Sequence, residues 1–97
     1  MQRMTRTGAS SAWEVDAGLV NPVAGGAWTG PAIERLAALE DAIELIKTQR
    51  AEAAEKLERL KAQGRIRSAQ AQQLLSQKLM LSSMLTMLGE DARAEEE

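Results

Sequence analysis

The sequence predicts an all-α protein: an antiparallel helical hairpin, similar to a coiled coil, preceded by an extended arm without regular structure. From residue 31 onward, apolar residues recur every three or four positions, which is the spacing of one face of an α-helix. A glycine at position 64 interrupts this pattern and divides it into two helices. Residues 1–30 have no such period, and they hold five of the seven glycines and both tryptophans.

The arm is expected over residues 1–30, where Gly25-Gly26 is a turn signal. Trp13 and Trp28 stand among small residues, which let a backbone lie close to another surface, and tryptophan is enriched at the centres of interfaces. We expect the arm to bind a partner through four apolar residues: Trp13, Val15, Leu19 and Trp28. The alternative is that the tryptophans fold back onto the hairpin of the same chain.

The first helix is expected over about residues 31–63. Pro31 suits the first turn, where its missing N–H leaves no hydrogen bond unmade, and Gly30 or Thr29 precedes it as the N-cap. The apolar positions then advance by alternating steps of three and four, the heptad pattern of a coiled coil. The seam residues expected to bind a partner helix are Leu36, Leu39, Ile43, Ile46, Leu57 and Leu60. Arg50 lies in this seam, where it either fixes the helix register or extends its charged head to water.

The second helix is expected over about residues 68–89, after a turn over about residues 64–67. A connection this short makes the two helices antiparallel neighbours. Ser68 can cap the second helix and Gly89 can end it. Residues 90–97 form an acidic tail, which we expect to be solvated.

The second helix carries more apolar side chains than the first helix can cover. One of its sides can pack in the hairpin, but five large residues face elsewhere: Leu75, Leu79, Met80, Met84 and Met87. Full burial of each is worth about 1.5–3 kcal/mol, so together they favour association. We therefore expect these five residues to bind a protein partner.

The composition argues against catalysis. The chain has no His, Cys, Tyr or Phe, so the commonest general base and the commonest zinc ligands are missing. We expect no enzyme activity, cofactor, metal or small-molecule substrate. The longest apolar stretch, residues 79–88, is about half of the roughly 20 residues that a bilayer span needs, and the start lacks the apolar region of a signal peptide. The expected location is the cytoplasm or the inside of a macromolecular particle.

These features together predict a structural protein that assembles with itself or within a larger complex, such as a phage virion or a secretion apparatus. Two alternatives stay open. All charged residues between Glu58 and Glu90 are basic, and those around the turn could contact nucleic acid or another anion: Arg59, Lys61, Arg65 and Arg67. The methionines of the second helix could instead belong to a dedicated chaperone, because thioethers adapt to varied partner helices.

Overall fold

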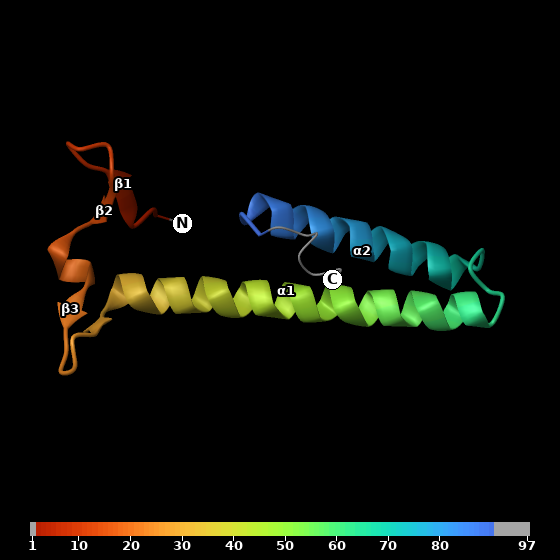
Figure 1. Cartoon of the computed structure of the whole chain (residues 1–97). Coiled ribbons are helices and arrows are strands. Elements are labelled where there is room, and N and C mark those ends of the chain that lie inside the picture. Colours follow the sequence, from red (N-terminus) through yellow and green to blue (C-terminus); the bar gives the residue numbers. More distant parts are fainter. Residues whose placement is uncertain (1, 91–97) are drawn as a thin grey trace. The chain divides into compact units, whose positions relative to one another are not determined.

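The computed structural model describes residues 2–90, and within them it contains two α-helices, one 3₁₀-helix and four short strands. The longer helix, α1, spans Pro31–Ala62, and α2 spans Ala69–Met87 (Figure 1). The chain divides into two compact units, Met1–Glu40 and Asp41–Glu97, here called the N-terminal and C-terminal units. The division falls inside α1, so the first turns of this helix belong with the arm.

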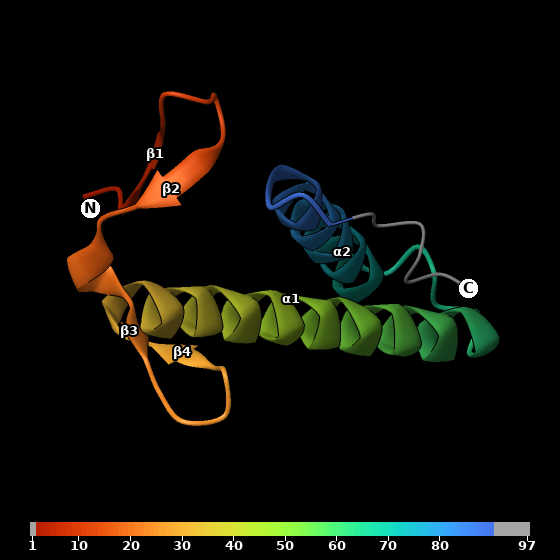
Figure 2. The same ribbon diagram turned by 60° about the vertical axis from the view of Figure 1, so that its left-hand side comes forward.

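The N-terminal unit contains two small β-hairpins (Figure 2). Strands β1 (Thr5–Thr7) and β2 (Trp13–Val15) pair antiparallel, and so do β3 (Asn21–Pro22) and β4 (Trp28–Thr29). The 3₁₀-helix, η1 (Ala17–Leu19), joins the two hairpins. The prediction of an arm without regular structure is therefore wrong, and "all-α" describes the chain only approximately. Strands of two or three residues are too short to show the alternation that identifies a strand in a sequence.

Charged side chains pair across the first hairpin. Arg6 on β1 lies opposite Glu14 on β2, and its Nε donates a hydrogen bond of 3.2 Å to Glu14 Oε1. Its Nη1 donates to Asp16 Oδ1. Both hydrogen bonds raise the pKa of the Arg6 guanidinium, and the one to Asp16 has the larger effect. On the same hairpin, the Arg3 guanidinium lies over the Trp13 ring, 4.7 Å from its centroid, in a cation–π contact.

Both helices of the C-terminal unit end at glycines, as predicted. Gly64 and Gly89 have φ of +72° and +83°, a left-handed conformation that other residues rarely adopt. At the first of these ends, the Arg65 N–H donates to the Leu60 carbonyl at 2.7 Å and the Gly64 N–H to the Lys61 carbonyl at 3.0 Å. These two bonds form a Schellman motif, which satisfies carbonyls that have no partner inside the helix.

The predicted cap of α2 is confirmed, because Ser68 Oγ accepts a hydrogen bond of 3.1 Å from the backbone N–H of Ala71. We expect Ser68→Ala to destabilise the C-terminal unit by about 0.5–2 kcal/mol, since this N–H loses its partner. Urea unfolding followed by circular dichroism measures the difference. Ser68→Asp, which keeps a capping oxygen, should retain most of the stability, and equal losses in both variants would contradict the capping role.

The core of the C-terminal unit lies between α1 and α2. Ile46, Leu81 and Leu85 form a buried cluster, and Ile43 and Met84 pack against it. The other buried residues continue the α1 seam and its counterpart on α2: Arg50, Ala53, Leu60 and Ala71. The two packed helices fit the predicted hairpin, and the heptad positions of α1 from Ile43 to Leu60 are all buried or half-buried.

Arg50 is only 5% exposed, so the alternative in which its head reaches water is wrong. Ala53 and Ala71 are almost fully buried as well, so Arg50 lies among the buried residues of the seam. Of the predicted acidic tail, only Glu90 lies within the described residues, where its Oε1 pairs with Lys47 Nζ at 3.5 Å.

Candidate interaction surfaces

The side of α2 that faces away from α1 is exposed and carries no charge. Among the 19 residues of α2 the only charged one is Lys78, which is half-buried, whereas 13 of the 32 residues of α1 are charged. We call this side the outer face of α2. Its apolar members are Leu75, Leu79, Met80 and Met87, all of them exposed. A solvated helix face normally carries charged residues, so this face has the composition of a surface that becomes covered.

The outer face consists of two apolar rows rather than one stripe. Leu75 and Leu79 lie one helical turn apart and form the first row. Met80 and Met87 lie two turns apart and form the second, roughly a quarter-turn around the helix. Between the rows lie three exposed uncharged polar residues: Gln72, Ser76 and Ser83.

Met84 does not belong to this face. The sequence predicts that Met84 faces a partner, but the structure places it half-buried against the cluster of Ile46, Leu81 and Leu85. Met84 lies three residues after Leu81 in α2, so these two side chains lie on the same side of the helix. The face that α2 buries is therefore wider than a strict heptad seam. The outer face keeps only four of the five predicted residues.

The seam of α1 divides between two environments. Ile46 and Leu60 are buried, and Ile43 and Leu57 are half-buried, within the C-terminal unit. The partner helix of the buried cluster is α2 of the same chain. Leu36 and Leu39, by contrast, are exposed in the N-terminal unit.

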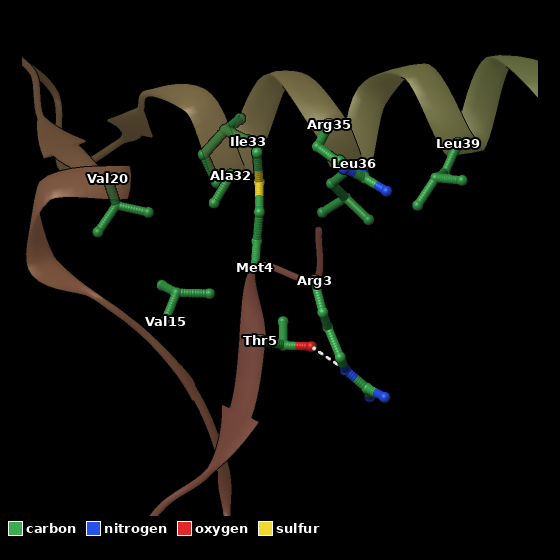
Figure 3. Close-up of a pocket in the computed structure, with 10 residues that line it drawn as sticks. All are labelled: Arg3, Met4, Thr5, Val15, Val20, Ala32, Ile33, Arg35, Leu36 and Leu39. Atoms are coloured by element: carbon green, nitrogen blue, oxygen red, sulfur yellow. Dashed lines mark hydrogen bonds between the residues drawn. The ribbon is translucent and has the colours of Figure 1, made fainter. Parts of the chain in front are cut away.

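Leu36 and Leu39 line an apolar cavity of about 560 Å³ within the N-terminal unit (Figure 3). The cavity lies between the first turns of α1 and the first β-hairpin. Figure 3 shows the Met4 side chain reaching from the chain at β1 toward Ile33 on α1. The apolar side chains that line the cavity are Met4, Val15, Val20, Ala32, Ile33, Leu36 and Leu39. Sequence reasoning missed Met4 and Val20, because isolated apolar residues in an aperiodic segment give no signal, and it missed Ile33, because this residue precedes the heptad seam that begins at Leu36.

The predicted arm residues do not form one surface. Val15 lines the apolar cavity, whereas Trp13 and Trp28 are exposed and do not line it. Leu19 is half-buried, and its carbonyl lies beside Gly30 at the start of α1. The two tryptophans are thus available on the surface of the N-terminal unit as separate apolar side chains.

The four basic residues predicted to contact an anion do not all lie at one site near the turn between α1 and α2. Arg59 and Arg65 line a polar cavity there, together with Lys56, which sequence reasoning did not single out. Lys61 and Arg67 lie close by in the chain but do not line this cavity. Arg59 Nη2 also lies 3.9 Å from Oε1 of Glu55, which is one turn earlier on α1.

Comparison of the chain with protein-family models, curated proteins and solved structures gave no match. Over residues 2–90, neither helix combines the length and the apolar character needed to cross a membrane. The same residues contain no cluster of three or more acidic side chains placed to hold a metal ion.

Proposed function

We propose that this chain is a non-enzymatic structural protein that self-associates through the outer face of α2. The observation that carries the proposal is the combination of four exposed apolar side chains with the absence of charge on that face. Covering them removes apolar surface from water, which is the main favourable contribution to association. The glutamine and serine side chains between the rows cost less to desolvate than charged groups would.

A second copy of the chain suits this face better than an unrelated partner does. In a symmetric dimer the same patch meets itself, so the patch must be complementary to itself, and charges of one sign on it would repel their copies near the two-fold axis. The outer face of α2 brings none. The exposed face of α1 has a different character, because acidic and basic residues alternate along it, as on a solvated helix. Self-pairing through α2 would leave that charged surface in water.

The two exposed tryptophans provide a second set of apolar side chains, through which the chain would bind a larger assembly. Trp13 and Trp28 lie on the hairpins of the N-terminal unit, away from the outer face of α2 in sequence. Exposed tryptophans are typical anchors of protein interfaces. They would tether the self-associated hairpins to a larger particle, such as a phage virion or a secretion apparatus.

Leu79→Glu tests the self-association. Leu79 is 61% exposed, so a charge there is tolerated in the monomer, but it would lie unpaired inside the paired face. We expect the wild-type chain to sediment as a dimer or larger oligomer at about 100 μM and the variant to associate at least about thirtyfold more weakly, equivalent to about 2 kcal/mol. Analytical ultracentrifugation measures both.

Leu45→Glu is the matched control, because Leu45 is exposed to a similar extent, 58%, on the charged surface of α1. We expect it to associate like the wild type. Equal weakening by the two substitutions would overturn the assignment to α2. A wild-type chain that stays monomeric up to about 1 mM would overturn self-association itself and favour a chaperone that holds another protein's helix.

A further inference from the structure

A polar cavity of about 310 Å³ lies at the turn between α1 and α2. Three of the residues around it are basic: Lys56 and Arg59 on α1, and Arg65 in the turn. Its remaining lining residues are Leu60, Gln63 and Gln70, so it contains hydrogen-bond donors but no carboxylate. This cavity belongs to the C-terminal unit alone and takes no part in the proposed self-association.

The fold brings these three cations together by simple means. Lys56 and Arg59 are three residues apart on α1, so they share one face of the helix. The hydrogen bond from the Arg65 N–H to the Leu60 carbonyl fixes the backbone from which the Arg65 side chain extends. Gln70 lies in the first turn of α2, where the helix dipole adds partial positive charge. The C-terminal end of α1, beside Leu60 and Gln63, carries the opposite partial charge, so the positive character of the cavity comes mainly from its three basic side chains.

The nearest acidic group competes only weakly for the cavity. Glu55 is 3.9 Å from Arg59, but both side chains are largely exposed, and a pair of this kind is screened by water and salt. Beyond Glu58 no acidic residue follows until Glu90, whereas five basic residues lie between them. An incoming anion can therefore recruit Arg59 without breaking a strong ion pair.

We propose that this cavity binds a phosphate of a nucleic-acid backbone. Arginine offers paired N–H donors that match phosphate oxygens, and two arginines with a lysine can surround one phosphate from several directions. A volume of about 310 Å³ is at the lower end of small-molecule sites, so it admits a phosphate with its adjoining sugar. Lys61 and Arg67, next to the cavity in the chain, add positive charge beside it.

The recognition would be independent of base sequence. No aromatic residue lines the cavity, so bases have no surface on which to stack. Three to five phosphate contacts would make the affinity for duplex DNA fall by roughly 40- to 500-fold between 50 and 200 mM salt. Fluorescence anisotropy with a short labelled duplex measures this dependence.

Two double variants with the same change in charge distinguish binding in the cavity from general attraction to the positive charge around the turn. We expect Arg59→Gln/Arg65→Gln to weaken binding to the duplex by at least about tenfold, because it removes the groups that contact the phosphate directly. Lys61→Gln/Arg67→Gln removes two charges outside the cavity and should weaken it by less than about threefold. Glu55→Gln should strengthen binding, because Arg59 then loses its competitor. Equal losses in the two double variants, or no binding at about 50 mM salt, would overturn the proposal.

Competition identifies the chemistry that the cavity selects. At equal ionic strength, inorganic phosphate should displace the duplex more effectively than free glutamate, which offers a carboxylate without the multivalency of a polyanion. The reverse order would overturn the assignment to phosphate and favour an acidic protein surface as the ligand. Leu79→Glu leaves the cavity intact, so this proposal and the proposed self-association can fail independently.

Discussion

Replacing Leu85 with alanine is expected to destabilise the C-terminal unit by about 2–5 kcal/mol. Leu85 is fully buried, and it packs with Ile46 and Leu81 at the centre of the only buried apolar cluster among the described residues. Truncation removes buried methyl groups and leaves a cavity that two rigid helices cannot easily close. A small domain has only about 5–15 kcal/mol of stability in total, so the loss would be a large fraction of it.

Urea unfolding of the dilute chain, followed by circular dichroism, measures this change. Leu79→Ala is the matched control, since it makes the same truncation on the same helix at an exposed position. We expect it to change the free energy of unfolding of the monomer by no more than about 0.5 kcal/mol. Losses of similar size at the two positions would contradict the packing of α2 described here.

The helices could be predicted from the sequence because their signals are local and repeated. The alternating spacing along α1 identified Ile46 and Leu60 as seam residues, and the structure buries both. Ser68 and Gly64 identified the turn, because a capping hydroxyl and a left-handed glycine each act on hydrogen bonds within a few residues. Such short-range effects require no knowledge of the rest of the fold.

Other features depend on how segments pack, and these could not be predicted. Arg50 has a stem long enough to reach water, and whether it does so depends on how closely α2 approaches. Met84 lies at the border between the buried and the exposed face of α2. Its burial therefore depends on how wide a strip of α2 contacts α1. The cavity beside Leu36 requires Met4 and Val20 to come from separate strands and loops, which no periodic pattern records.

Gly30 marks the place where the arm meets α1, and we expect Gly30→Ala to disrupt the N-terminal unit. Its φ is +123°, and an added Cβ would lie 2.6 Å from the Leu19 carbonyl oxygen and 2.9 Å from Val20 Cα. These neighbours are backbone atoms, so they cannot rotate away as a flexible side chain would. The strained φ alone costs about 1–3 kcal/mol for a residue with a side chain, and the clash adds to it.

Gly25→Ala separates these two costs, because Gly25 also has a positive φ, +87°, but a Cβ there would meet no atom within 4 Å. Hydrogen exchange measured by NMR reports the difference at the Glu34 amide, which donates to the Gly30 carbonyl at 3.0 Å. We expect Gly30→Ala to accelerate this exchange by roughly ten- to a hundredfold, equivalent to about 1.4–2.7 kcal/mol of local opening. Gly25→Ala should leave it nearly unchanged, because its strain is confined to the β3–β4 turn. If both variants exchange alike at Glu34, the close approach of Gly30 to Leu19 and Val20 does not hold the arm against the start of α1.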